Sequence, residues 1–425
     1  MALKNVKAFV ITTLLIVLLF GSCSTTKKLQ KYVEQKVSVE QLMQSIGVDS
    51  YSCTYPLYYN TGAQWNERSL ELIEQAQDYI LVSTFLGVEH PSVYPVWKAL
   101  ADKAAEGVDV YIIVDSSSNF QMVPIVNERI QAAFMLLHEL GLNFVEYNSL
   151  SLSNLFFIPK LLDRDHRKYW VVDGQTLAAG GVNINHTSVA WPPGYGNIDT
   201  MVELGSSQAI KEVVETFVAT WNNYSTTFLD ADSFNIVKNN ESETARFWLL
   251  DHYWPTKSKI TTLFDLFSIY ATKELWMVQG YTFLTPALLK RIKFAVDRGV
   301  KVNFILSDYS TQPKYELASR YGILDLIEAG ASVYMYHSPV ESFLHAKIMV
   351  ADGKLVSIGS ANYNLRSQSL SRELNFLFED ERIGEENLKY IETLLKECTV
   401  VTKQEAESYR NFKSWYNHLL MQIWG

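Results

Sequence analysis

The sequence predicts an α/β protein made of two pseudo-symmetric halves, each a mixed sheet flanked by helices, which together form one central site. Three observations lead to this prediction. Apolar helical segments alternate with short β-rich segments in the same order twice, glycines stand at matching places in both copies, and each copy closes with the same polar hairpin. The length of 425 residues is enough for two cores, and the 48% hydrophobic content is ordinary for a globular protein.

The first segment differs in character from the rest of the chain. Lys4 and Lys7 precede an uncharged, mostly apolar run from Ala8 to Phe20, and small residues follow at Gly21 and Ser22. This order is typical of a secretory signal peptide, and the run is too short to span a bilayer as a stable helix. We therefore expect residues 1–22 to be a signal peptide of the lipoprotein type, with a retained membrane anchor as the alternative.

Cys23 follows the small residues directly and resembles the lipidation site of bacterial lipoproteins, although Phe20 stands where that family more often has Leu. A lipidated Cys23 would tether the mature protein to a membrane through a polar segment over residues 23–60. An ordinary peptidase site with an unmodified cysteine is the alternative. Cys53 and Cys398 remain, enough for one disulfide at most, and no cysteine spacing indicates a zinc site.

The charge balance argues against a polyanionic partner. The whole chain has 37 basic and 46 acidic residues, and removing residues 1–22 deletes two lysines, which leaves 35 − 46 = −11. A protein that binds nucleic acid needs a basic surface, so we expect no nucleic-acid partner, although a local basic channel stays compatible with this total.

The repeated plan defines two halves, expected at residues 61–230 and 231–400 and followed by a C-terminal helix at 401–425. In each half, three helices each lead into a strand. Gly107 and Gly299 stand where the second helix of each half would end in a left-handed cap before a buried strand. The helix and strand pairs are 66–77 with 78–87, 96–107 with 108–115 and 132–141 with 142–147, and then 260–273 with 274–283, 287–299 with 300–308 and 321–330 with 331–336.

The hairpins read "HRKYWVVDGQTLAAGGVN" from His166 and "HAKIMVADGKLVSIGSAN" from His345. Asp-Gly predicts a two-residue turn with positive φ at both residues, at Asp173-Gly174 and Asp352-Gly353. Counting outward from the second turn pairs Lys347 with Ile358 and His345 with Ser360, and the same count in the first half pairs His166 with Gly181. One face of each hairpin would then carry the polar set, which is His345, Lys347, Ser360 and Asn362 in the second half and His166, Lys168 and Asn183 in the first.

Imidazole, ammonium, hydroxyl and amide groups on one face make a site for an oxyanion, because lysine supplies charge and the other groups supply directed hydrogen bonds. A metal site is disfavoured, since the lysine beside each histidine would repel a cation. We expect neither a metal nor a cofactor.

The paired pattern resembles the signature of the phospholipase D superfamily, which is His-x-Lys, four residues, Asp, six residues and Gly-Ser-x-Asn. The second copy matches fully, whereas the first has Gly181 in place of serine, which would lose one hydroxyl donor or replace it with a backbone N–H. The flanks "RDHRKYWVVDG", "GSANYNLRS" and "FVATWN" are most similar to bacterial cardiolipin synthases, although the usual paired membrane spans are missing from the sequence. The resemblance covers roughly Trp65 to Glu397 and implies that both halves are phospholipase D-like.

The resemblance implies a mechanism in which one histidine attacks phosphorus and the other protonates the departing alcohol. It assigns His166 as nucleophile and His345 as general acid, and the reverse assignment stays open. Asp199 and Glu373 would orient the two imidazoles, with Glu203 as an alternative in the first half. Asp173 and Asp352 belong to the catalytic signature, but their place in the turns favours a structural role. The implied catalytic set is His166, Lys168, Asp173, His345, Lys347 and Asp352, and the implied phosphate-binding set is Asn183, Ser360 and Asn362.

The leading interpretation is a cardiolipin synthase-like phosphatidyltransferase that acts on phospholipids in the bacterial cell envelope, as a membrane-anchored lipoprotein and a monomer. A phospholipase D hydrolase uses the same chemistry with water as the acceptor, and a nuclease is disfavoured by the acidic charge. An inactive envelope lipoprotein that keeps the hairpins only as scaffold is the alternative from a different class.

Overall fold

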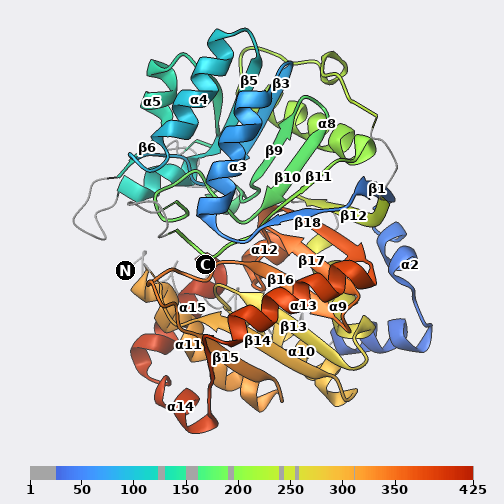
Figure 1. Cartoon of the computed structure of the whole chain (residues 1–425). Helices are drawn as coiled ribbons and strands as arrows, with labels where there is room; N and C mark the ends of the chain where they lie inside the picture. The colour runs from blue at the N-terminus through green and yellow to red at the C-terminus, as the bar shows by residue number, and fades with distance from the viewer. Residues whose placement is uncertain are drawn as a thin grey trace, which may run out of the picture.

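The computed structural model describes residues 25–122, 130–149, 161–189, 196–238, 244–253, 258–310 and 312–424, and the predicted lipidation site at Cys23 lies outside these ranges. Two sheets, one in each half, lie next to each other with helices packed around them (Figure 1). The predicted α/β class with two mixed sheets flanked by helices is confirmed. No described helix is long and apolar enough to cross a bilayer.

The sheet of the first half contains both parallel and antiparallel pairs. Its central strand β3 (Tyr79–Thr84) pairs in parallel with β5 (Asp109–Asp115) and antiparallel with β9 (Tyr169–Val172), the first strand of the hairpin. Along the sheet the order is β2 (Leu57–Tyr59), β11 (Met201–Leu204), β10 (Thr176–Gly180), β9 (Tyr169–Val172), β3 (Tyr79–Thr84), β5 (Asp109–Asp115) and β7 (Asn143–Tyr147). Two short strands, β4 (Val88–Glu89) and β6 (Gln131–Ala132), pair separately.

The sheet of the second half repeats this order and extends it at both edges. The shared part runs β18, β17, β16, β13, β14 and β15, which matches β11, β10, β9, β3, β5 and β7 strand for strand. This agreement in topology supports an internal duplication. The full order is β1 (Ser50–Thr54), β12 (Thr244–His252), β18 (Ser371–Glu379), β17 (Leu355–Gly359), β16 (Lys347–Ala351), β13 (Glu274–Gln279), β14 (Lys301–Ser307), β15 (Ser332–Tyr336) and β19 (Cys398–Val400), with β8 (Arg164–Asp165) paired to β18.

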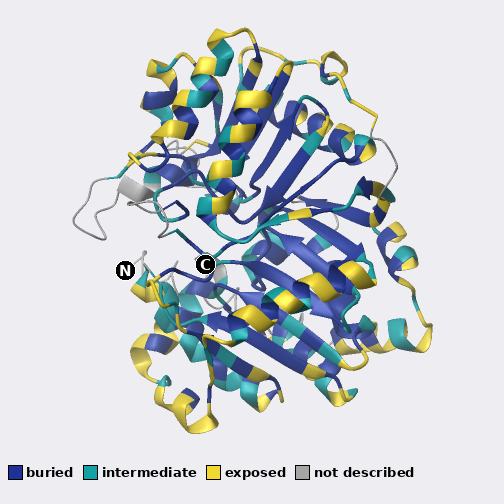
Figure 2. Cartoon of the chain, in the orientation of Figure 1, coloured by how far each residue is buried: buried dark blue, intermediate teal, exposed yellow. Residues whose placement is uncertain are grey.

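The helices cover the faces of the sheets, and each has a buried side and an exposed side (Figure 2). Helices of the first half are α3 (Gly62–Gln75), α4 (Tyr94–Ala105), α5 (Phe134–Glu139) and α8 (Ser207–Tyr224). Those of the second half are α9 (Lys259–Tyr270), α10 (Pro286–Asp297), α11 (Pro313–Glu328), α12 (Leu365–Ser369) and α13 (Glu381–Leu395). Gly107 and Gly299, which follow α4 and α10, have φ of +100° and +88°, as the predicted left-handed caps require.

A continuous apolar core joins the two halves. Val171 and Leu177 from the first hairpin and Ile348 and Val356 from the second belong to one buried cluster. Because removing this apolar surface from water stabilises both sheets together, the halves form a rigid frame for any site between them.

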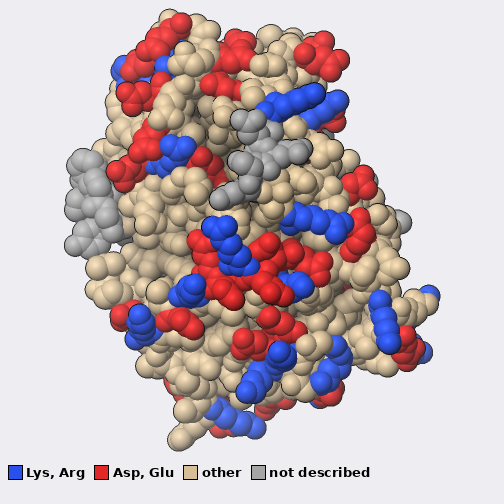
Figure 3. All heavy atoms as spheres, turned by 45° about the vertical axis from the view of Figure 1, so that its right-hand side comes forward, with Lys and Arg blue, Asp and Glu red and all other residues tan. Residues whose placement is uncertain are grey.

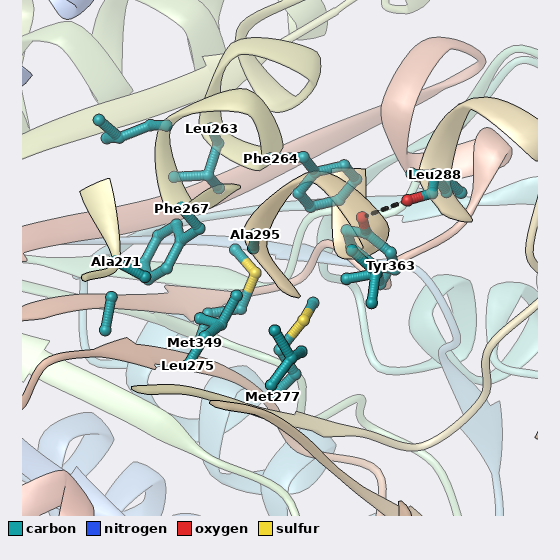
Figure 4. Packing of buried hydrophobic residues seen from close by; sticks show 14 of the residues in the cluster. Leu263, Phe264, Phe267, Ala271, Leu275, Met277, Leu288, Ala295, Met349 and Tyr363 are labelled. Carbon is teal, nitrogen blue, oxygen red and sulfur yellow. Dashed lines mark hydrogen bonds between the residues drawn. The ribbon is translucent and has the colours of Figure 1, made fainter. Parts of the chain in front are cut away.

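A second core lies on the outer face of the larger sheet, where α9 and α10 pack against β13 and β16 (Figure 4). The Tyr363 ring lies against Phe264 at a centroid distance of 4.7 Å, and its hydroxyl donates to Leu288 O at 3.0 Å. Tyr363 follows Asn362 directly, so this core fixes the end of the second motif.

The hairpin turns keep the predicted conformation but not the predicted length. Asp352 and Gly353 have φ of +53° and +64°, and the first hairpin is similar. Pairing resumes at Ala351 with Leu355, so three residues separate the strands instead of two, and the predicted register is wrong by one residue. The first hairpin shows the same error, because the pairing begins at Val172 with Thr176.

The predicted pairs Lys347 with Ile358, His345 with Ser360 and His166 with Gly181 therefore do not form. Ile348 pairs with Ile358 instead. The polar residues still converge, because β17 ends at Gly359 and the following Ser360 and Asn362 leave the strand.

The segment expected as a tether is folded where the structure describes it. Residues 25–34 are helical, α2 (Val39–Gln44) follows, and Leu29, Leu42 and Met43 are buried in the core beside α9. Its strands β1 and β2 then join different sheets, by pairing with β12 and β11. The prediction missed this packing because isolated apolar residues among polar ones give little periodic signal over so short a stretch.

The C-terminal segment also differs from the single predicted helix. It forms two helices, α14 (Lys403–Ser408) and α15 (Phe412–Trp424). Cys53 and Cys398 are free thiols.

Candidate active site

The two motif histidines line one pocket at the junction of the halves. His166 lies just before β9 and His345 just before β16. Their backbone N–H groups bond across the junction, from His166 to Arg372 O at 3.1 Å and from His345 to Ile198 O at 2.7 Å. Each histidine is therefore positioned by the backbone of the other half.

Each imidazole also contacts an acid that comes from the other half of the chain. Glu373 lies 3.0 Å from His166 Nδ1, and Asp199 lies 2.6 Å from His345 Nδ1. A carboxylate at Nδ1 accepts a hydrogen bond from the N–H group there and leaves Nε2 as the reactive nitrogen. The side chains of His166 and His345 are 14% and 13% exposed, and both line the pocket. We therefore expect a substrate to reach Nε2 of each ring from the pocket.

Both imidazoles are neutral at neutral pH in the unliganded site. Burial lowers the pKa of His166 to about 4, because the pull of Glu373 does not compensate for lost hydration and Lys168 adds repulsion. Burial and Lys347 lower the pKa of His345 to about 4 against the pull of Asp199. A bound phosphodiester anion would raise both pKa values, which favours one imidazolium in the complex.

The two lysines supply positive charge from behind the histidines. Lys168 Nζ donates to His166 O at 2.5 Å, Lys347 Nζ donates to His345 O, and Lys347 Nζ also lies 3.8 Å from Asp199 Oδ2. Burial lowers the pKa of Lys168 to about 7 and that of Lys347 to about 8, in each case against the pull of nearby carboxylates. An anion in the pocket would restore full protonation of both side chains.

Ser360 does not occupy the phosphate-binding place that the sequence suggested. Its side chain is fully buried, and its hydroxyl donates to Glu373 Oε2 at 2.5 Å and accepts from Leu374 N at 3.0 Å. Burial raises the pKa of Glu373, but His166, Lys168 and Ser360 outweigh it and hold the pKa at about 2. Ser360 therefore positions the acid that contacts His166.

Gly181, the counterpart of Ser360, leaves room for Asp199. A Cβ atom at Gly181 would lie 2.1 Å from Asp199 Oδ1 and 2.5 Å from Oδ2, far closer than atoms can approach. The Gly181 N–H donates to Thr200 O at 3.0 Å, so it is not the substitute phosphate donor that the sequence suggested.

Asp173 and Asp352 lie at the turn ends of the hairpins, whereas the histidines lie before the strands begin. Asp173 accepts hydrogen bonds of 2.8–3.0 Å from the N–H groups of Gln77, Asp78 and Tyr79, where α3 leads into β3. Asp352 likewise accepts from Thr272, Lys273 and Glu274, where α9 leads into β13. The structural interpretation of both aspartates therefore fits their contacts better than the catalytic one.

Asn183 and Asn362 both line the pocket, as their predicted contact with phosphate requires. Asn183 Oδ1 accepts from Leu86 N at 3.0 Å, which turns its amide N–H₂ group away from that bond. Glu203, the alternative orienting acid, instead pairs with Arg68 at 2.9 Å and with Tyr59. Among the described residues, no group of three or more His, Cys, Asp or Glu side chains could hold a metal ion.

The wall of the pocket combines apolar and polar side chains, and the Phe85 ring of the first half lies 4.8 Å from the His166 imidazole, centroid to centroid. Aromatic rings cluster beside His345, where Phe343 lies 5.2 Å and Tyr281 6.4 Å from the imidazole centroid. The first half contributes uncharged hydrogen-bonding groups from Asn185, Thr187 and Asn197. Phe283 and Tyr315 extend the aromatic side, where Met421 of α15 packs behind Phe283.

A buried ion network behind the pocket joins the two halves. Arg167, next to His166, pairs with Asp165 at 2.7 Å and with Asp251 of β12 at 2.9 Å. Arg372, next to Glu373, lies 3.7 Å from Asp165. Since breaking a buried pair leaves an uncompensated charge, this network fixes the distance between His166 and its acid.

Comparison with known proteins agrees with this geometry. The domain family described as "Cardiolipin synthase, PLD-like domain" matches residues 69–221 and 269–395. The chain belongs to the phospholipase D superfamily. Each matched segment contains one complete hairpin, so each half of this superfamily enzyme carries one copy of the motif.

Individual relatives within the phospholipase D superfamily are distant. A probable cardiolipin synthase, YwiE of Bacillus subtilis, is 24% identical over 310 residues, which cover 72% of this chain and 59% of that protein. A cardiolipin synthase of Clostridium perfringens is 26% identical over 361 residues, covering 83% of this chain and 72% of that protein. The crystal structure of phosphatidylserine synthase from Haemophilus influenzae has the same fold, with a TM-score of 0.67 at 13% identity over 91% of this chain and 97% of that one.

Sequence reasoning missed several residues of this phospholipase D site. Arg366 lines the pocket four residues after Asn362, within the stretch "GSANYNLRS". Its closeness in the sequence to the motif asparagine is a signal that the sequence did contain. The aromatic wall gave no such signal, because its rings come from three separate segments of the chain.

Proposed function

We propose that the protein is a cardiolipin synthase-like phosphatidyltransferase that works through a phosphohistidine intermediate. One observation carries the proposal. Two neutral imidazoles, each with a carboxylate at Nδ1, face one pocket with Nε2 available and two lysine charges behind them.

In the first step, His166 Nε2 attacks the phosphorus of a phospholipid diester, and the bond from phosphorus to the head-group oxygen breaks. His345, which becomes the imidazolium when the phosphodiester anion binds, gives its Nε2 proton to the departing oxygen. In the second step, an acceptor hydroxyl gives its proton to His345, its oxygen attacks phosphorus, and the nitrogen–phosphorus bond breaks. Lys168 and Lys347 stabilise the charge that develops on the phosphoryl oxygens.

The walls of the pocket support a lipid substrate. Aromatic rings such as Tyr281 and Phe343 give apolar contact for a lipid, and the amides of Asn185 and Asn197 can hydrogen-bond the hydroxyls of a glycerol head group. A nuclease would need a basic track, whereas acidic side chains gather near the centre of the face in Figure 3 with basic ones scattered among them.

The test is to incubate the purified protein, without residues 1–22, with phosphatidylglycerol vesicles and identify the products. Cardiolipin plus glycerol is the expected result. Phosphatidic acid alone would show that water is the acceptor and that the protein is a hydrolase. No turnover, in a protein that melts cooperatively, would favour the scaffold alternative, and His166→Ala serves as the matched inactive control.

We further propose that Cys23 is lipidated and holds the enzyme at the bacterial cell envelope. The support is the sequence alone, namely the signal-like segment 1–22 and the cysteine that follows it. A fatty-acid probe should label the wild-type protein in cells and not the Cys23→Ser variant. An unlabelled wild type would refute this anchor while leaving the enzymatic proposal intact.

A further inference from the structure

The turns that follow the two motifs have the same hydrogen-bonded frame. After the second motif, Asn364 Oδ1 accepts from Ser367 N at 2.8 Å, and Ser367 Oγ accepts from Asn362 N at 3.0 Å. Both turns line the pocket. The frame fixes the backbone of each turn relative to the asparagine of its motif.

After the first motif the corresponding bonds are 3.0 Å, from Ser188 N to Asn185 Oδ1, and 3.3 Å, from Asn183 N to Ser188 Oγ. Within these matched frames one position differs in charge. It holds Thr187 in the first half and Arg366 in the second, and both residues line the pocket. The duplicated architecture therefore supplies an internal control for what a cation adds at this place.

Arg366 is the one lysine or arginine among the described residues that line this pocket. Its Nε donates to Ser371 Oγ at 3.1 Å, which fixes the direction of the guanidinium, and the side chain is partly exposed. Burial lowers the pKa of Arg366 despite the pull of Tyr315, Asp115 and Glu373, and Arg164 adds repulsion. An anion in the pocket would restore the stabilisation that burial removes.

In the proposed mechanism the phosphate of the lipid donor lies between His166 and His345, with the charges of Lys168 and Lys347 behind them. A cation elsewhere on the pocket wall fits a second anionic group on the ligands. Guanidinium binds phosphate through two parallel hydrogen bonds, which suits a phosphodiester that is held but does not react.

We propose that Arg366 binds the phosphate of the acceptor phospholipid and so determines the selectivity for this acceptor. This inference rests on the proposed function, since it concerns the second substrate of the same transfer. It predicts a preference for an acceptor that carries phosphate over a small neutral alcohol.

The test uses the purified chain without residues 1–22, with phosphatidylglycerol vesicles as donor in the presence of ethanol. Cardiolipin reports transfer to the phosphate-bearing acceptor, and phosphatidylethanol reports transfer to the neutral one. Arg366→Thr, which copies the first half, should lower the ratio of cardiolipin to phosphatidylethanol about ten- to hundredfold, the loss typical of a charge-assisted contact. Arg366→Lys should recover part of the ratio, and Arg382→Gln on the exposed side of α13 is the matched control.

An unchanged ratio in Arg366→Thr would overturn the inference, as would an equal fall in both products that Arg366→Lys does not reverse. A second measurement uses the wild type and so does not depend on the folding of variants. Glycerol 3-phosphate should inhibit formation of cardiolipin more strongly than formation of phosphatidylethanol. Equal inhibition would also refute the role of Arg366. A wild type that forms neither product would instead refute the proposed function and, with it, this inference.

Discussion

In the first half of the site, Asp199 fills space that a glycine leaves open, whereas in the second half Glu373 accepts a hydrogen bond from a serine. The extra methylene of glutamate carries its carboxylate farther from its own backbone, so Ser360 fits beside Glu373. The shorter aspartate lies where a side chain at Gly181 would be. The glycine and the aspartate are therefore a matched pair, and the missing serine is no simple loss of a phosphate ligand.

The two halves also differ in the turn after the motif, where Thr187 and Arg366 occupy matched positions. The reacting groups are nearly symmetric, while the groups around them are not. We therefore expect the duplicated groups to carry the chemistry and the divergent groups around them to determine which substrate lies on which side.

The largest expected effect tests whether the two histidines are equivalent. His166→Ala and His345→Ala should each lower turnover of phosphatidylglycerol by about a thousandfold or more, because the first variant loses nucleophilic attack and the second loses proton transfer. With a diester that releases p-nitrophenol, which needs no proton to depart, His345→Ala should recover most of the first-turnover rate while His166→Ala should not. The opposite pattern would reverse the assignment of nucleophile and acid.

Substitutions at Gly181 and Ser360 test whether each of these small residues is matched to its neighbouring acid, Asp199 or Glu373. Gly181→Ser should lower kcat/KM at least about tenfold, because the new side chain displaces Asp199 from His345. Ser360→Gly should cost only a few-fold, since Glu373 keeps its contact with His166. Combining Gly181→Ser with Asp199→Glu should recover activity relative to Gly181→Ser alone, and no recovery would contradict the steric explanation.

The pH dependence distinguishes the two lysines. Their pKa values of about 7 for Lys168 and about 8 for Lys347 mean that charge is lost as pH rises through these values, so kcat/KM should fall on the basic side. Arginine stays protonated, and Lys168→Arg should move this decline to higher pH more than Lys347→Arg does. Initial rates between about pH 5 and 9 in the wild type and the two variants provide the test. If neither variant shifts the fall in kcat/KM at high pH, a group other than the two lysines causes that fall.

The smallest effect concerns the aspartates of the two turns. Asp352 accepts four hydrogen bonds and Asp173 three, so Asp352→Asn should destabilise the protein by about 1–2 kcal/mol and Asp173→Asn by about 1 kcal/mol. Turnover per folded molecule should change less than about twofold, because neither carboxylate touches the pocket. Urea unfolding measures the first quantity, and a large loss of turnover at full folding would return the aspartates to the catalytic set.

The pKa of Asp352 adds a pH signature to this test. Burial raises it, but the hydrogen bonds from Thr272, Lys273 and Glu274 outweigh burial and leave it below its ordinary value. The contribution of Asp352 is then present above the unfolded pKa of about 4 and is lost as pH falls through the lower folded value. The stability difference between the wild type and Asp352→Asn should therefore shrink in acid.

Much of this arrangement could be predicted from the sequence, because duplication makes a weak signal visible twice. The two halves, the hairpins, the positive φ values at Asp173 and Asp352, and the superfamily all follow from repeated patterns. The register could not be predicted, since an Asp-Gly turn accommodates loops of two or three residues that differ only in where pairing resumes. The exchange of Asp199 and Glu373 between the histidines depends on how two halves dock, and no local pattern encodes docking.

The strands β1 and β2 have a mechanical consequence for how the enzyme loads its substrate. Only Tyr55 and Pro56 separate them, yet each is hydrogen-bonded into a different sheet. Movement of one half relative to the other would require a long, flexible linker between β1 and β2. A linker of two residues is too short for such movement. The segment β1–β2 thus ties the two sheets together, and we expect a phospholipid to enter the pocket without separation of the sheets.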